Sequence, residues 1–163
     1  GLGSSDYTGG DTMPIRLALN LTDGRVFSSA DAGGALQGSF FNSPYAYNTV
    51  IKCIPNAPQA GTYKVDMIDT YGDGWNGASL EFVIDGVTTS LSISGAQGAS
   101  NSETVTVPSG TSSLDVIFKS GAWDSEVKYT ITYSKLDGSN SQVALSDGPT
   151  PAADTPKIFS ICQ

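Results

Sequence analysis

Apolar and polar residues alternate along several short stretches of this chain, a pattern that predicts half-buried β-strands. The most regular alternation covers residues 127–133, in which Val127, Tyr129, Ile131 and Tyr133 are separated by polar residues. The same period flanks a glycine-rich loop, and it predicts one strand before the loop and one after it. Together with further short runs, the pattern predicts strands over residues 14–20, 47–54, 63–67, 80–84, 88–94, 103–107, 114–118, 127–133, 142–146 and 157–162.

About ten short strands, with no stretch of helical period, predict an all-β fold of antiparallel strands. A β-sandwich or jelly roll is the expected architecture, and a barrel is the lesser alternative. We expect one domain over residues 13–163, preceded by a Gly-, Ser- and Asp-rich arm over residues 1–12. A small separate unit before residue 60 is an alternative, although no linker marks its boundary.

The composition narrows the classes of function. Charged residues make up 15% of the 163 residues, the net charge is −8, and histidine is absent. An acidic chain with eight Lys and Arg residues is poorly suited to bind nucleic acid or an anionic membrane, and no stretch is apolar enough to span one. Without histidine, Ser and Cys nucleophiles lack their usual general base, so we expect no enzymatic activity.

Cys53 and Cys162 are the two cysteines of the chain, too few for a structural zinc site without other soft ligands. We expect them to form a disulfide that ties the last residues to an early strand; two buried free thiols are the alternative. A disulfide and a polar Ser/Thr/Gly surface favour a secreted, extracellular protein. Asn20 begins the triplet Asn-Leu-Thr, which permits N-glycosylation.

The loop over residues 69–77, Asp-Thr-Tyr-Gly-Asp-Gly-Trp-Asn-Gly, joins two predicted strands and contains most of the candidate chemistry. Asp69 and Asp73 supply carboxylates, Asn76 supplies an amide oxygen, and three glycines let the backbone bend toward a cation. These ligands suit Ca²⁺, and Asp69, Asp73 and Gly74 fall where positions 1, 5 and 6 of an EF-hand loop would be, although position 3 is Tyr71. The closing position of such a loop is Leu80 rather than Glu, so a further ligand has to come from elsewhere. The alternative is an ordinary connection whose Asp and Asn side chains form Asx turns.

A second turn, Gly121-Ala-Trp-Asp-Ser-Glu126, precedes the most regular strand and adds another carboxylate. In sequence and order, the two segments resemble the "DSYGDGWNG" and "G-x-W-x-x-E" motif pair of secreted β-domains in surface proteins of bacteria, algae and protists. The resemblance covers about residues 60–135, and the departures, Thr70 for Ser and Lys128-Tyr129 for Ser-Trp, remove no ligand. It implies a β-sandwich whose two motif loops meet at one end around Ca²⁺, with the ligands Asp69, Asp73, Asn76 and Glu126.

The family has no single established function, and each motif contains one tryptophan. We expect Trp75 and Trp123 to pack beneath the loops as apolar supports; exposed rings that stack on sugars are the alternative. We predict a Ca²⁺-stabilised, extracellular β-sandwich that assembles with copies of itself into a surface appendage, filament or coat. In this hypothesis, the arm over residues 1–12 lies along a sheet edge of the next copy. A calcium-dependent carbohydrate-binding or adhesion module is the alternative, in which Ca²⁺ and the tryptophans contact a glycan.

Overall fold

The computed structural model divides the chain into two compact units, Gly1–Lys52 and Cys53–Gln163. It describes residues 9–31 and 46–162, so residues 1–8 of the predicted arm lie outside the described residues. Within the described ranges, the regular structure consists of antiparallel strands and two single-turn 3-10 helices, which confirms the all-β prediction. No helix in these ranges is long and apolar enough to cross a membrane.

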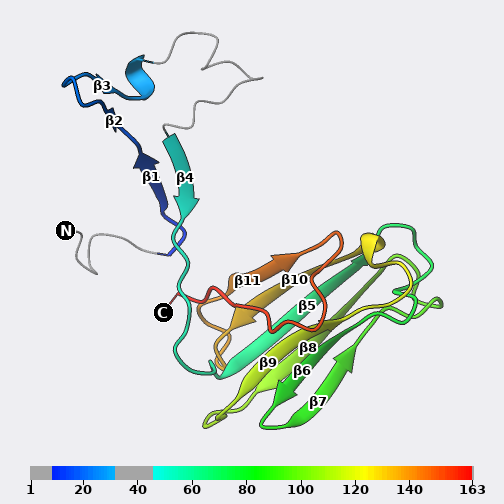
Figure 1. Cartoon of the computed structure of the whole chain (residues 1–163). Coiled ribbons are helices and arrows are strands. Elements are labelled where there is room, and N and C mark those ends of the chain that lie inside the picture. The colour runs from blue at the N-terminus through cyan, green and yellow to red at the C-terminus, as the bar shows by residue number, and fades with distance from the viewer. Residues whose placement is uncertain (1–8, 32–45, 163) are drawn as a thin grey trace. The chain divides into compact units, whose positions relative to one another are not determined.

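The first unit is built around two strands, β1 (Thr12–Arg16) and β4 (Ala46–Val50), which pair antiparallel and lie side by side in Figure 1. We call this pair the ladder. The short strands β2 (Leu19–Asn20) and β3 (Val26–Phe27) form a second antiparallel pair, and the 3-10 helix η1 (Ser29–Asp31) follows. The division after Lys52 differs from the boundary expected after residue 12, because β1 takes its partner from β4 and not from a strand of the second unit.

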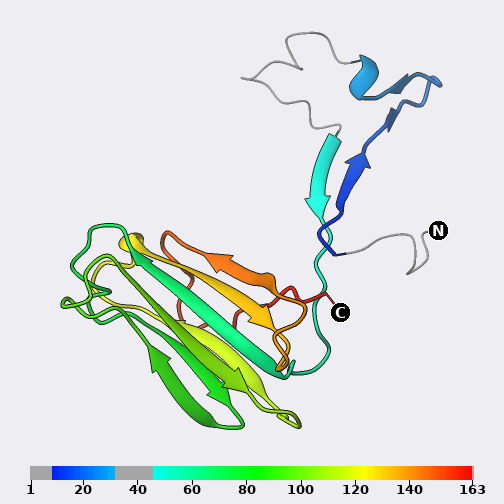
Figure 2. The same cartoon turned by 180° about the vertical axis from the view of Figure 1, so that it is seen from behind.

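The second unit contains two antiparallel sheets, in the orders β11-β10-β5-β8 and β7-β6-β9, which Figures 1 and 2 show from opposite sides. Seven strands in sheets of four and three form a sandwich, whereas a jelly roll has eight strands. The strands lie where the alternation predicts them, each within a few residues: β5 (Gly61–Asp69), β6 (Ser79–Ile84), β7 (Val87–Leu91), β8 (Ser100–Val107), β9 (Leu114–Lys119), β10 (Val127–Ser134) and β11 (Gln142–Asp147).

Every second side chain of the central strands points between the two sheets and is buried. In β5 these are Tyr63, Val65 and Met67, and the facing sheet contributes residues such as Phe82 and Phe118 to the same core. The rings of Tyr63 and Phe82, from different sheets, have centroids 6.2 Å apart in an edge-on arrangement, a favourable geometry for aromatic pairs. Burial of these side chains is the main force that holds the sheets together.

The segment after β11 runs along one open side of the sandwich, where the sequence predicts a strand over residues 157–162. The amide of Lys157 donates to the carbonyl of Val116 in β9, and the amide of Ser160 donates to that of Ala144 in β11, both at 2.8 Å. Because these bonds go to edge strands of different sheets, the segment forms no continuous ladder with either, and the strand prediction is wrong here.

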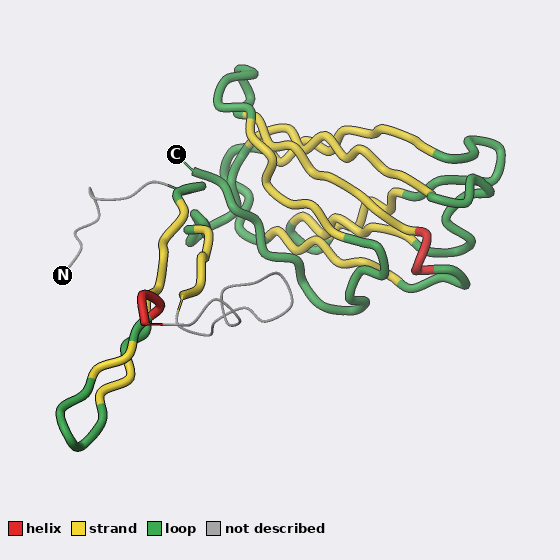
Figure 3. Tube along the Cα trace, turned by 90° about the horizontal axis from the view of Figure 1, so that it is seen from above, coloured by secondary structure: helices red, strands yellow, loops and turns green. Residues whose placement is uncertain are grey.

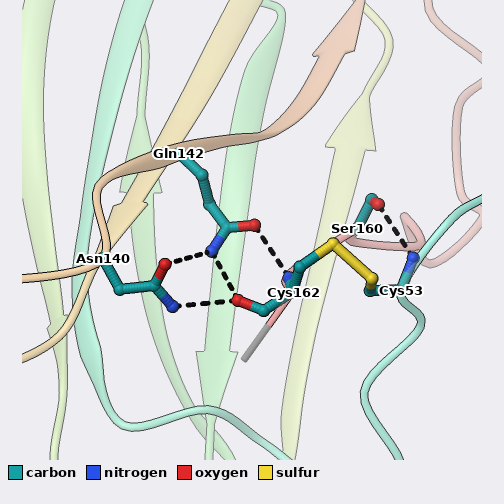
Figure 4. Close-up of a disulfide and its surroundings, with 5 residues drawn as sticks. All are labelled: Cys53, Asn140, Gln142, Ser160 and Cys162. Carbon is teal, nitrogen blue, oxygen red and sulfur yellow. Dashed lines mark hydrogen bonds between the residues drawn. A yellow bond between two sulfur atoms is a disulfide. The ribbon is translucent and has the colours of Figure 1, made fainter. Parts of the chain in front are cut away.

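A disulfide joins Cys53 and Cys162, as the sequence predicts, with the two Cα atoms 5.1 Å apart. Figure 4 shows that the side-chain amides of Asn140 and Gln142 donate to the carbonyl of Cys162 at 2.9 and 2.8 Å. The hydroxyl of Ser160 accepts a bond from the amide of Cys53 at 3.1 Å. Because β4 ends at Val50, Cys53 lies after the strand, and the strand predicted over residues 47–54 extends too far.

Candidate metal centre

Asp69 is the last residue of β5 and is buried, with 2% of its surface exposed. Its carboxylate accepts hydrogen bonds from the backbone N–H groups of Tyr71 (3.0 Å), Gly72 (3.0 Å) and Gly74 (2.7 Å). These bonds fold the following loop around the carboxylate, as an Asx turn does. They engage most of the roughly four lone-pair positions of a carboxylate, and the backbone N–H of Asp73 adds a further attraction. Asp69 therefore organises the loop, and one of its oxygens also belongs to the acidic cluster described below.

Gly74 allows the loop to pass close to a neighbouring chain segment. Its φ of +96° favours glycine, and a Cβ atom here would lie 2.7 Å from the nitrogen of Gly95 and 2.8 Å from the carbonyl oxygen of Ile93. The next residue, Trp75, donates its backbone N–H to that same carbonyl at 2.8 Å. The close approach fixes the path of the loop and the direction of the residues that follow.

Asp73 lies at the exposed tip of this loop, and Asn76 braces it. The side-chain amide of Asn76 donates to the carboxylate of Asp73 at 2.7 Å and to the carbonyl of Gly74 at 2.9 Å. With this orientation the amide NH₂ faces Asp73, so the structure gives Asn76 the role of positioning a carboxylate. A role as a direct ligand stays a prediction.

Glu126 comes from the second motif loop, which lies against the first. It ends the 3-10 helix η3 (Asp124–Glu126), drawn in red at one end of the sandwich in Figure 3. The carbonyl of Glu126 accepts a bond from the amide of Thr70 at 3.0 Å, and that of Asn76 accepts one from the amide of Ala122 at 3.1 Å. A Cβ atom at Gly121 would collide with the backbone of Ala78, so glycine is needed where the loops touch.

The two loops bring three carboxylates together. One oxygen each from Asp69, Asp73 and Glu126 lie within 4.8 Å of one another. Calcium binds oxygen at about 2.3–2.6 Å, so two ligand atoms on opposite sides of the ion are about 5 Å apart. The three oxygens could therefore surround one cation without a rearrangement of the backbone.

Without a cation, the negative charges of the three carboxylates repel one another. Partial burial raises the pKa of Glu126, and the nearby negative charges of Asp69 and Asp73 raise it further. For Asp69, burial also raises the pKa, but the N–H groups of the loop outweigh it, so the pKa is lowered and the group stays ionised. A cation among the three oxygens would turn this repulsion into attraction.

Asp124 is a further carboxylate of the second motif loop, and the structure gives it a role within that loop. The carboxylate of Asp124 accepts bonds from the hydroxyl of Ser120 (2.5 Å) and the amide of Gly121 (2.8 Å), which closes the second loop. Its position four residues after Ser120, at a turn, was a signal for this capping role.

Trp75 is 1% exposed, and its indole N–H donates to the carbonyl of Ile68 at 3.0 Å. It is thus an apolar support, and a role in sugar stacking is excluded for it in this fold. The expectation that Trp123 is a second support is wrong, because Trp123, directly before η3, is 60% exposed. Tyr71, for which the sequence predicts no role, is 75% exposed in the first loop. Asn20 is exposed in β2.

Comparison of the chain with protein-family models, with curated proteins and with solved structures finds no match.

Proposed function

We propose that this protein is an extracellular, Ca²⁺-stabilised β-sandwich that serves as the self-assembling subunit of a surface appendage, filament or coat. The observation that carries the proposal is the apolar surface of the first unit. Its ladder has two strands, and the side chains of Met13, Ile15, Tyr47 and Val50 are all exposed. A two-stranded ladder is marginally stable alone, and an exposed apolar surface of this kind is typical of a binding interface.

The acidic cluster supports calcium as the stabilising ion. Its ligands are hard oxygen atoms, and the described residues around Asp69, Asp73 and Glu126 include no sulfur or imidazole group that would favour zinc. An ion here would connect the β5–β6 loop with the β9–β10 loop. This connection would hold one end of the sandwich together, as the disulfide holds the C-terminal segment.

The extracellular location is supported by the Cys53–Cys162 disulfide, a type of bond that persists in oxidising compartments. Calcium concentrations are also high enough outside the cell to fill a site with three carboxylate ligands.

Size-exclusion chromatography with light scattering tests this function on the full chain. In millimolar CaCl₂ we expect species larger than a monomer whose proportion rises with protein concentration. With a chelator in excess, we expect a lower unfolding temperature and less assembly. A monomer at every concentration, with the same melting curve in calcium and in chelator, would contradict both parts of the proposal.

A second candidate function is calcium-dependent binding of a glycan, and the exposed aromatic rings beside the cluster favour it. The carbonyl of Trp123 accepts a bond from the amide of Glu126 (3.0 Å), and the amide of Tyr71 donates to Asp69 (3.0 Å). The backbone of each exposed aromatic residue is therefore hydrogen-bonded to a residue of the acidic cluster. Rings in such positions can stack on sugars.

Glycan-array binding in calcium and in chelator, with Trp123→Ala and Tyr71→Ala, tests this second candidate. We expect binding that requires calcium and both rings if the candidate is right. Binding that survives the double substitution, or no binding to any glycan, would exclude this second candidate, and assembly would remain as the proposed function.

A further inference from the structure

The disulfide encloses the whole sandwich in one covalent loop. Cys53 is the first residue of the second unit, directly after Lys52 of the first, and Cys162 is the last residue that the structure describes. All seven strands of the sandwich and both motif loops lie between the two cysteines, which are 109 residues apart in the sequence. The residues before Cys53 and after Cys162 lie outside this closed loop.

The chain enters and leaves the closed loop at one place. The Cα atoms of Cys53 and Cys162 are 5.1 Å apart, and the amide of Ile161 donates to the carbonyl of Cys53 at 2.8 Å. Gln142 holds both backbone groups of Cys162, because its side-chain oxygen accepts from the amide at 2.7 Å and its side-chain NH₂ donates to the carbonyl at 2.8 Å (Figure 4). The entry and exit points of the sandwich therefore lie side by side and are joined by a covalent bond.

Non-covalent contacts alone would resist tension between these two points poorly. Because the points are adjacent, a pull that separates them first loads the few hydrogen bonds between Cys53 and residues 160–162. Behind these bonds, the segment after β11 is held to the edge strands by the amides of Ser160, Lys157 and Asp154, which are spaced three residues apart. Bonds that break one after another each carry the whole load in turn, so the segment would peel away from the two sheets.

We propose that the Cys53–Cys162 disulfide is a mechanical tether that keeps tension along the chain out of the sandwich. A pull between the first unit and residue 163 passes from Cys53 through the two sulfur atoms to Cys162, so neither sheet carries the load. The acidic cluster lies inside the closed loop and keeps its geometry under such a load. The inference goes beyond the proposed function, because it requires neither assembly nor calcium.

Optical tweezers on single full-length chains, with DNA handles attached through peptide tags at residues 1 and 163, test the tether. Under non-reducing conditions the wild type should show no lengthening beyond that of the first unit, up to the force at which the handles overstretch. The Cys53→Ser/Cys162→Ser variant, and the wild type after addition of a reductant, should lengthen by about 36–39 nm more. This is the stretch of the 109 residues at about 3.3–3.6 Å each. Circular dichroism verifies that the variant is folded without load.

A handle placed inside the closed loop is the matched control, and it leaves both cysteines in place. Residue 137 lies in the exposed turn after β10, so a pull between residues 1 and 137 reaches the sandwich even when the disulfide is intact. The oxidised wild type should then lengthen by up to about 9 nm, the stretch of the roughly 25 residues between positions 137 and 162. This comparison needs no cysteine variant, so it tests the tether even if that variant does not fold.

Three results would overturn the tether. Lengthening of the oxidised wild type by the full 36–39 nm would mean that the disulfide does not carry the load. A folded, disulfide-free chain that resists the same force as the wild type would show that the hydrogen bonds around the two cysteines suffice. No lengthening of the oxidised chain in the pull from residue 137 would show that the sandwich resists tension without the tether. None of these results depends on calcium or on association, so the proposed function is tested separately.

Discussion

The two units of this chain contain the same kind of β sequence and bury it very differently. In β5, alternate side chains such as Tyr63 and Val65 are completely buried, because a second sheet covers that face. In β1 and β4, apolar side chains such as Ile15 and Tyr47 stay exposed, because the described part of the first unit has two-stranded sheets alone. Alternation thus specifies a strand and its faces, but stability comes only from what covers the apolar face.

The largest loss of stability should follow removal of the disulfide, which constrains the second unit and not the first. Cys53 and Cys162 are 109 residues apart, and opening a loop of this length should reduce the free energy of unfolding by about 4–5 kcal/mol. The measurement is urea denaturation of the Cys53→Ser/Cys162→Ser variant, followed by the fluorescence of buried Trp75. An unchanged midpoint would mean that the hydrogen bonds of Asn140 and Gln142 hold the C-terminal segment without it.

Matched truncations in the two units compare them directly. Phe82→Ala removes a completely buried ring from the sandwich and should cost about 3–4 kcal/mol, because it leaves a cavity between the sheets. Ile15→Ala removes an exposed side chain from the ladder and should change the stability of the isolated monomer by less than about 0.5 kcal/mol. Denaturation at low protein concentration provides both values. A large loss for Ile15→Ala in a monomer would show that the ladder face is covered within its own chain.

Calcium should stabilise the sandwich and leave the ladder unchanged. At a free concentration one hundred times its dissociation constant, an ion that binds only the folded state adds about 2.7 kcal/mol. We expect Glu126→Gln and Asp73→Asn to lose most of the calcium-induced rise in the unfolding temperature. Glu103→Gln is the matched control, because Glu103 lies on β8 outside the acidic cluster. If the control loses as much as the two ligand variants, the acidic cluster is not the site.

The ion pair that fastens the C-terminal segment should contribute less to stability than the disulfide, the core or a bound calcium ion. Burial raises the pKa of Asp147, but the ammonium of Lys157 and bonds from Gly148 and Tyr129 outweigh it, so the pKa is lowered. A carboxyl with a lowered pKa stabilises the fold above its unfolded pKa of about 3.9, and this contribution is lost as the pH falls through the folded value. Asp147→Asn should cost about 1–2 kcal/mol at pH 7.

The difference between Asp147→Asn and the wild type should shrink below about pH 4, where the wild-type carboxyl is protonated as well. Asp115→Asn is the control, since Asp115 is exposed on β9 and forms no ion pair among the described residues. A pH-independent difference would indicate that Asp147 acts through packing and not through its charge.

Much of the second unit could be predicted from the sequence because its determinants are local. The period-two runs place β5 to β11 within a few residues, since an alternation of Val, Ile, Leu and aromatic residues suits only an extended strand at a sandwich interface. The Asx-rich loop is equally local, because Asp69 bonds to amides no more than five residues away. The prediction that the two motif loops meet came from the resemblance of the motif pair. The spacing of the residues along the chain does not indicate which loops lie together.

The sequence by itself determined the strands β5 to β11 with their inward faces, the pairing of the two cysteines and the loop residues that can carry a cation. The tertiary structure decided which strands became partners, that residues 157–162 connect two sheets instead of forming a strand, and that Trp123 is exposed while Trp75 is buried. It also decided that Glu126 joins Asp69 and Asp73 within 4.8 Å. A local pattern indicates the conformation of its own segment. Strand pairing and side-chain burial also depend on segments that are distant in the sequence, and a local pattern contains no information about those segments.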